Sequence, residues 1–138
     1  AARAIAYAVK KLGGKACIFN RTVANAKAIA DKYGFAFSQL GPDCLYDLDY
    51  YSDIIIQTTS VGSGSVGPSS EKNDPLYFYN FKGTESLYDI VYTPEVTPIM
   101  TRAMAAGCKV SNGYSMLRYQ GYKQFKLFTG VDYGNDTE

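Results

Sequence analysis

The tripeptide Asn20-Arg21-Thr22 has the side chains and the position needed to bind a phosphorylated ribose. It closes the short apolar stretch Lys15–Asn20, which predicts a strand, and a helix is predicted before it over Ala1–Leu12. In a dinucleotide-binding βαβ unit, the residue at the end of the second strand faces the adenosine ribose. An acidic residue there binds both ribose hydroxyls, whereas an arginine accommodates a 2′-phosphate. Arg21 therefore predicts NADP, not NAD, as the cofactor, although an arginine after a strand is by itself more often a solvated side chain.

A second stretch, Gly62-Ser-Gly-Ser-Val-Gly67, matches the phosphate-binding pattern G-x-G-x-x-G and follows an apolar run. In that motif the third glycine opens a helix whose N-terminal amides hold the pyrophosphate. Here the next residues have no apolar periodicity and include Pro68 and Pro75. Residues 62–75 are therefore predicted to form a loop, and the match to the phosphate-binding pattern is coincidental.

Alternating patterns place these motifs on an α/β fold. The predicted strands are Lys15–Asn20, Phe35–Ser38, Asp53–Thr58, Leu87–Val91 and Lys109–Ser111. The predicted helices are Ala1–Leu12, Val23–Tyr33 with Thr22 as its cap, Asp43–Ser52, Thr97–Ala106 and Ser115–Phe128. The continuous apolar run in Asp53–Thr58 is typical of a buried parallel strand. The alternation predicts a Rossmann-like three-layer sandwich, a parallel sheet with helices on both faces.

Composition limits the classes of function. The 138 residues carry a formal charge of +1, which favours neither nucleic acid nor an anionic membrane as a partner. No apolar run approaches the roughly 18 residues of a membrane span. The absence of histidine excludes histidine-ligated metal sites and histidine-based catalytic triads, and no metal site is predicted. Three widely spaced cysteines indicate reduced thiols in the cytoplasm.

Seven short motifs in a fixed order carry a more specific signal. They are Asn20-Arg21-Thr22, Thr58-Thr-Ser-Val-Gly62, Tyr88-Asp-Ile-Val-Tyr-Thr-Pro94, Thr97-Pro98, Ser111-Asn-Gly113, Met116-Leu117 and Gln120-Gly121 with Phe125. Each motif is weak alone, but the set and its spacing resemble the C-terminal, nucleotide-binding half of shikimate dehydrogenase. The resemblance covers Ala1 to Gly130. It implies an NADP-binding domain over 1–130, truncated at its N-terminus, followed by a polar tail over 131–138.

The resemblance implies a role for each matching residue. Ala1 matches the end of the pyrophosphate loop, and Asn20, Arg21 and Thr22 match the 2′-phosphate clamp. Asn25 occupies a position where many relatives carry a second basic residue, for which Lys27 could substitute. The residues implied to line the ribose and nicotinamide are Thr58, Thr59, Ser60, Val61, Ile90 and Gly113. Tyr92 and Gln120 are implied to bind the shikimate substrate.

The family's catalytic lysine and aspartate come from a separate N-terminal substrate domain, so no catalytic residue is assigned within this chain. The implied reaction is the NADPH-dependent reduction of 3-dehydroshikimate to shikimate in aromatic amino-acid biosynthesis. A quinate/shikimate dehydrogenase of broader specificity, or a non-catalytic NADP-binding module, are the alternatives. The resemblance also implies that the first strand and the glycine-rich loop precede Ala1. We therefore expect the 138 residues to be inactive alone and to be completed by a longer polypeptide or another chain, and an oligomer is possible.

Overall fold

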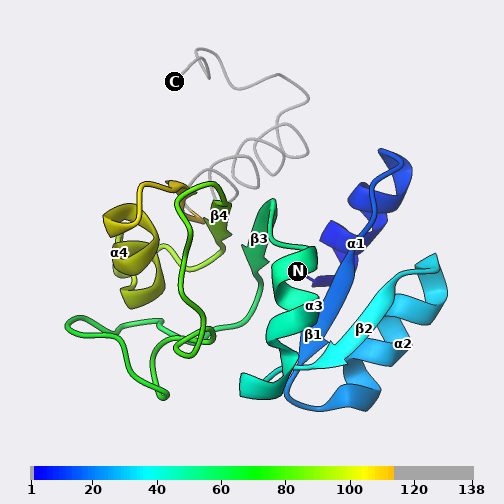
Figure 1. Cartoon of the computed structure of the whole chain (residues 1–138), viewed down its shortest axis with the longest axis horizontal. Coiled ribbons are helices and arrows are strands. Elements are labelled where there is room, and N and C mark those ends of the chain that lie inside the picture. Colours follow the sequence, from blue (N-terminus) through cyan, green and yellow to red (C-terminus); the bar gives the residue numbers. More distant parts are fainter. Residues whose placement is uncertain (1, 114–138) are drawn as a thin grey trace, which may run out of the picture.

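Parallel strands alternate with helices except where a long segment without a helix, residues 58–85, connects two successive strands (Figure 1). The computed structural model describes residues 2–113. Its strands are β1 (Cys17–Asn20), β2 (Ala36–Gln39), β3 (Ile54–Gln57), β4 (Ser86–Asp89) and β5 (Lys109–Ser111). Its helices are α1 (Ala2–Lys11), α2 (Val23–Tyr33), α3 (Leu45–Tyr50) and α4 (Pro98–Ala105), with a 3-10 turn, η1 (Pro42–Cys44), before α3. The helix predicted over Ser115–Phe128 and the polar tail lie outside the described residues.

The strands form two separate parallel ribbons within residues 2–113. β1 pairs with β2, while β4 pairs with both β3 and β5. The register places the last residues of paired strands side by side, Asn20 with Gln39 and Gln57 with Asp89. The loops that leave β1 and β3 lie at the same, lower side of the molecule in Figure 1. The carboxyl ends of parallel strands, where such sheets bind their ligands, therefore gather on one side.

Helices cover both sides of the strands. α2 packs on β1 and β2 through a face whose buried residues are Ala26, Ile29 and Ala30, and α1 packs on α2. α4 packs on β4 and β5. Figure 1 shows α3 in front of β1 and α2 behind β2, which makes the arrangement layered. The predicted α/β sandwich is thereby confirmed.

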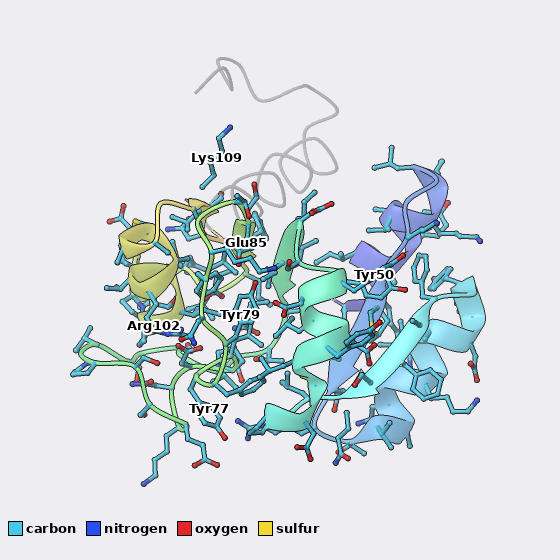
Figure 2. The ribbon with its side chains drawn as sticks, viewed as in Figure 1. Tyr50, Tyr77, Tyr79, Glu85, Arg102 and Lys109 are labelled. Atoms are coloured by element: carbon cyan, nitrogen blue, oxygen red, sulfur yellow. The ribbon has the colours of Figure 1, made fainter. Side chains whose placement is uncertain are left out.

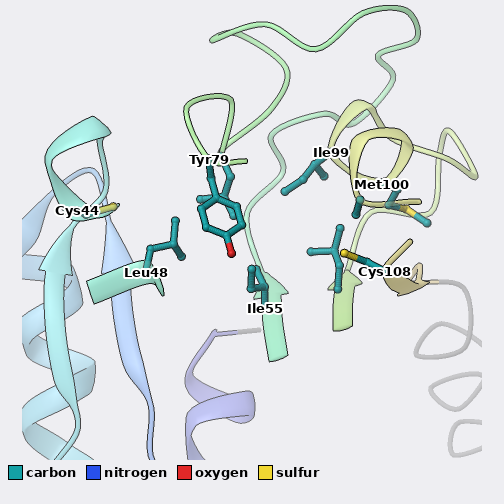
Figure 3. Close-up of a cluster of buried hydrophobic side chains, with 10 residues drawn as sticks. Cys44, Leu48, Ile55, Tyr79, Ile99, Met100 and Cys108 are labelled. Atoms are coloured by element: carbon teal, nitrogen blue, oxygen red, sulfur yellow. The ribbon is translucent and has the colours of Figure 1, made fainter. Parts of the chain in front are cut away.

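The main hydrophobic core lies between the β3–β5 ribbon, α3, α4 and the segment 76–81 (Figure 3). Tyr79 stands between Leu48 of α3 and Ile99 of α4 and is only 1% exposed. The buried members are Cys44, Leu48, Ile55, Leu76, Tyr79, Leu87, Ile99, Met100, Ala103 and Cys108. The segment 76–81 is therefore part of the folded core, although it contains no helix or strand.

A buried carboxylate, Glu85, fixes the end of this segment. It accepts hydrogen bonds from the Tyr79 hydroxyl and from the amides of Lys82 and Gly83, at 3.0 and 2.9 Å for the two amides. Burial alone would raise the pKa of Glu85, but these donors outweigh it and lower the pKa to about 2. Glu85 is thus a fixed anion that ties the turn before β4 to the core.

Two local predictions hold only in part. Thr22 is the N-cap residue of α2 and has the extended backbone of that position, but its side chain makes no capping hydrogen bond, and its amide donates to the Asn20 side chain at 2.8 Å. The strand at 53–58 is not buried on both faces. Ile55 and Gln57 are buried, while Ile54 is 66% exposed, because successive side chains of a strand point to opposite faces and only one face meets the core.

Among residues 2–113, no helix combines the length and apolar character that crossing a membrane would require.

Candidate functional site

Arg21 lines a pocket of about 730 Å³ beside the end of β1. Its main chain is held in place, since the Gln39 side chain at the end of β2 donates to the Arg21 carbonyl at 3.0 Å. The guanidinium itself has solvent access. The pocket is further lined by Leu40, Gly41, Pro42, Val61, Glu71, Lys72, Pro75, Tyr77 and Phe78. A guanidinium on a held main chain, beside apolar side chains such as Leu40 and Phe78, suits a flat, apolar ring that carries an anionic group.

A second pocket, of about 450 Å³, lies where the loops after β3 and β4 meet. It is lined by Thr58, Thr59, Ser60, Ser63, Ile90, Val91, Tyr92 and Thr93. Five of these were predicted from the sequence as site residues: Thr58, Thr59, Ser60, Ile90 and Tyr92. Val61 lines the first pocket and follows Ser60 directly, so the segment 58–61 joins the two pockets.

Gln57, which sequence reasoning missed, sets the conformation of this joining segment. Its side-chain amide donates to the carbonyls of Thr59 and Val61, at 3.0 and 3.1 Å, and to the Asp89 carboxylate at 3.3 Å. Its side-chain oxygen accepts from both the amide and the hydroxyl of Thr59 at 2.5 Å. One buried amide side chain therefore positions the backbone between the two pockets.

Asp89, at the end of β4, holds Gln57 in turn. It is fully buried and accepts hydrogen bonds from the Val91 amide at 2.9 Å and from the Thr97 hydroxyl at 2.7 Å. Burial raises its pKa, and the hydrogen bonds from Val91, Thr97 and Gln57 oppose that rise. The sequence signal was available: Gln57 and Asp89 are polar residues that each end an apolar strand.

The wall of the first pocket that the segment 71–78 forms depends on Arg102 of α4. Sequence reasoning missed this residue too. Its Nε lies 2.8 Å from Asp74, which is fully buried, and its two terminal nitrogens donate to the carbonyls of Leu76 and Tyr79 at 2.6 Å. Figure 2 shows Arg102 reaching toward the segment that carries Tyr77 and Tyr79. α4 thereby anchors the irregular segment that supplies Lys72, Pro75, Tyr77 and Phe78 to the pocket.

Gly113 follows β5 and packs directly on the backbone of the second pocket. Its amide donates to the Val91 carbonyl at 3.2 Å. A Cβ at this position would lie 1.8 Å from the carbonyl oxygen of Ile90, which no side chain can tolerate without displacement of the backbone. The absence of a side chain at Gly113 is therefore required by the Ile90 main chain, and the contact with the nicotinamide that the resemblance implies stays a prediction.

Replacing Gly113 by alanine is expected to destabilise the fold by about 1–3 kcal/mol, because the added methyl group forces Ile90 away from β5. Thermal melting of the natural-length protein measures this. Gly41→Ala is the matched control, since its φ of 167° suits any residue and a Cβ there meets open space. Equal melting temperatures for the two variants would contradict this prediction, because they would mean that the Ile90 main chain moves away from residue 113 without cost.

Of the other predicted residues that the structure describes, Asn20, Thr22 and Asn25 line neither pocket. Asn25 is exposed on α2 and lines neither pocket. Lys27, the suggested substitute, is engaged on α2 by an ion pair with Asp31 and lies over the Phe37 ring at 5.6 Å. Ala1 and Gln120 lie outside the described residues.

Comparison with known proteins identifies the relatives of this arrangement. No family model matches the chain. A curated NADP⁺ shikimate dehydrogenase of Bartonella henselae is 38% identical over 95% of this chain and 45% of its own length. One of Methanothrix thermoacetophila is 37% identical over 96% of this chain and 46% of its own length. The chain is homologous to shikimate dehydrogenases over about half of their length.

Solved structures agree with this relationship. The shikimate dehydrogenase of Aquifex aeolicus superposes with a TM-score of 0.76 at 29% identity, over 96% of this chain and 46% of that one. A shikimate dehydrogenase in complex with NADP⁺ superposes with a TM-score of 0.66 at 33% identity, over 90% of this chain and 45% of that one. A quinate dehydrogenase of Corynebacterium glutamicum in complex with NAD superposes with a TM-score of 0.73 at 25% identity, over 94% of this chain and 46% of that one. The chain spans less than half the length of these relatives.

Proposed function

We propose that this chain is the cofactor-binding part of an NADP-dependent shikimate dehydrogenase, which interconverts 3-dehydroshikimate and shikimate. The observation that carries the proposal is the position of Arg21, at the end of β1 and on the wall of the larger pocket. An arginine fork matches the geometry of a phosphate, and its planar face can stack on an aromatic base.

The larger pocket fits the adenosine 2′-phosphate half of the cofactor. Arg21 supplies positive charge for the phosphate, with Asn20 and Thr22 forming the turn that presents it. Leu40, Pro42 and Phe78 supply apolar surface for the adenine ring. This combination suits an anionic adenosine better than an unphosphorylated one.

The smaller pocket fits the nicotinamide half. When bound, the nicotinamide ring exchanges the hydride with the carbon of the substrate. Ile90 offers an apolar wall that keeps water from the ring face, and the carbonyl of Gly113, which lies against the Ile90 main chain, is proposed to contact the carboxamide. The Tyr92 side chain is 47% exposed at the rim, where its hydroxyl can bind the substrate carboxylate, and Gln120 is proposed to bind substrate hydroxyls.

The proton-transfer pair is proposed to come from a separate substrate domain, because no lysine or aspartate of this chain lies in a matching motif. We also propose that a further strand lies between β1 and β3. Each of these strands has one backbone edge without a partner strand in residues 2–113, and such edges are costly unless paired or covered. All three cysteines, Cys17, Cys44 and Cys108, are free thiols, which supports a reducing, cytoplasmic location.

A quinate/shikimate dehydrogenase is the second candidate, because the likeness to a quinate dehydrogenase is as close in fold as that to the shikimate enzymes. Arg21 favours a phosphorylated ribose and therefore NADP, whereas the quinate dehydrogenase of the comparison is in complex with NAD. A non-catalytic NADP-binding module has less support, because such a module has no need of Tyr92 at the nicotinamide end.

A dehydrogenase assay tests the proposal. The natural-length protein is expected to oxidise shikimate with NADP⁺, to use NAD⁺ poorly and to oxidise quinate slowly. The 138-residue chain assayed alone is expected to show no turnover, since it lacks the proton-transfer pair. Preference for NAD⁺, or faster oxidation of quinate than of shikimate, would favour the second candidate, and absence of any turnover by the natural-length protein would contradict both.

A further inference from the structure

We propose that Lys72 is a second specificity-determining cation for the 2′-phosphate, acting together with Arg21 in the larger pocket that both residues line. The inference rests on the proposed function, because it assigns a further residue to the same cofactor site. It answers a question that the sequence leaves open, namely which side chain complements Arg21 when Asn25 occupies the position of the second basic residue.

Neither residue suggested by the sequence is placed for this role. Asn25 is uncharged, exposed and outside both pockets. Lys27 forms an ion pair with Asp31, which lies four residues further along α2, and its ammonium group lies over the Phe37 ring. Its ammonium group is therefore engaged by a partner on its own helix, and Lys27 lines neither pocket.

Lys72 reaches the same pocket as Arg21 from a distant part of the chain. Among the described residues that line this pocket, Arg21 and Lys72 carry the positive charges. Lys72 belongs to the loop 62–75 that leaves β3, whereas Arg21 ends β1, so the two cations are brought together only by the fold.

The loop that carries Lys72 is held by defined hydrogen bonds. The Asn73 side chain accepts from the Ser70 amide at 2.8 Å and donates to the Pro68 carbonyl at 3.1 Å. The next residue, Asp74, is buried and is held by Arg102 and by the Ser69 hydroxyl at 2.6 Å. The Lys72 main chain is thus fixed on both sides, which lowers the entropy lost when its ammonium meets a phosphate.

Glu71 lines the same pocket and carries the opposite charge. A carboxylate accepts hydrogen bonds from free ribose hydroxyls, as in NAD-binding sites, and repels a phosphate. Of the adjacent pair Glu71 and Lys72, Glu71 therefore favours NAD⁺, and Lys72 favours NADP⁺. Removing the Lys72 charge leaves Glu71 unopposed on this loop, so the loss should fall on NADP⁺ and not on NAD⁺.

The test compares Lys72→Gln with Lys109→Gln in the natural-length protein, titrated with NADP⁺ and with NAD⁺ by calorimetry at low salt. Lys109 is the matched control, because it is an exposed lysine that begins β5 and lies far from Tyr77 of the pocket in Figure 2. Lys72→Gln is expected to raise the Kd for NADP⁺ roughly 2- to 5-fold and to leave that for NAD⁺ unchanged, as for an exposed ion pair. The difference should shrink as salt is added.

The outcomes separate the inference from the proposed function. If Lys72→Gln behaves like Lys109→Gln, or weakens both cofactors equally, while the unmodified protein still prefers NADP⁺, then the role of Lys72 is overturned and the proposed function stands. If the unmodified protein shows no preference for NADP⁺, both are overturned. Glu71→Gln provides the opposite change and is expected to tighten NADP⁺ binding by a similar factor.

Discussion

Replacing Arg21 by alanine is expected to raise the Kd for NADP⁺ roughly 10- to 150-fold while leaving NAD⁺ binding nearly unchanged. A hydrogen-bonded contact to a charged group contributes about 1.5–3 kcal/mol, and NAD⁺ lacks the phosphate that makes it. The backbone around Arg21 should not change, because the Gln39 side chain binds the carbonyl of residue 21, not its side chain.

Calorimetric titration of the natural-length protein with each cofactor measures this effect. Lys109→Ala removes the same charge from the start of β5 and is expected to leave both affinities as they are. A parallel loss of NADP⁺ and NAD⁺ affinity in Arg21→Ala would mean that Arg21 stacks on the adenine without binding the phosphate. An unchanged NADP⁺ affinity would contradict the assignment of the clamp.

Replacing Arg102 by alanine is expected to have the largest effect on stability, a loss of about 3–5 kcal/mol. The change leaves the Asp74 carboxylate, which is fully buried, without its cation, and frees the carbonyls of Leu76 and Tyr79. Removing one partner of a buried pair costs more than the pair contributes, because the remaining charge stays buried. Urea denaturation of the natural-length protein measures the loss.

Lys82→Ala is the matched control for Arg102→Ala. It breaks the ion pair between Lys82 and Asp49, in which both side chains are at least half exposed, and such pairs contribute less than about 1 kcal/mol. Arg102→Lys should recover only part of the lost stability. A single ammonium group cannot replace the planar guanidinium, which donates at once to Asp74 and to the carbonyls of Leu76 and Tyr79. If Arg102→Ala proved as mild as Lys82→Ala, the segment 69–81 would have to be held by its apolar contacts alone.

The Arg102 variant also connects stability to the cofactor site. The segment that Arg102 anchors supplies Lys72, Tyr77 and Phe78 to the larger pocket. Weaker NADP⁺ binding is therefore expected together with the loss of stability, although Arg102 itself lines neither pocket.

Most of the fold could be predicted from the sequence because its signals are local. The helix Val23–Tyr33 and the strand Lys109–Ser111 have the predicted bounds, and most other elements differ by one to three residues at an end. Helix periodicity, a glycine such as Gly34 after a helix, and short apolar runs each act within a few residues of the chain. The burial of Ile54 was mispredicted, because exposure depends on what packs against the strand.

The candidate site could be predicted in part. Motif order brought Thr58–Val61, Ile90 and Tyr92 into one hypothesis, and the pockets place these residues near one another. Gln57 and Asp89 were not predicted as a pair, because their contact depends on the register between β3 and β4. Each residue is visible in the sequence as the polar end of a strand, but their pairing appears only when the two strands are aligned.

Sequence alone established an α/β chain with an arginine directly after the strand predicted at Lys15–Asn20, and with motifs that resemble in their order those of the shikimate dehydrogenases. Which groups meet is visible only in the folded chain: Lys72, and not Lys27, lines a pocket with Arg21, and Gly113 packs against the Ile90 main chain. Separation along the chain explains this difference between the elements and the site. A helix or strand depends on neighbours in sequence, whereas a binding site depends on residues that meet only after the chain has folded.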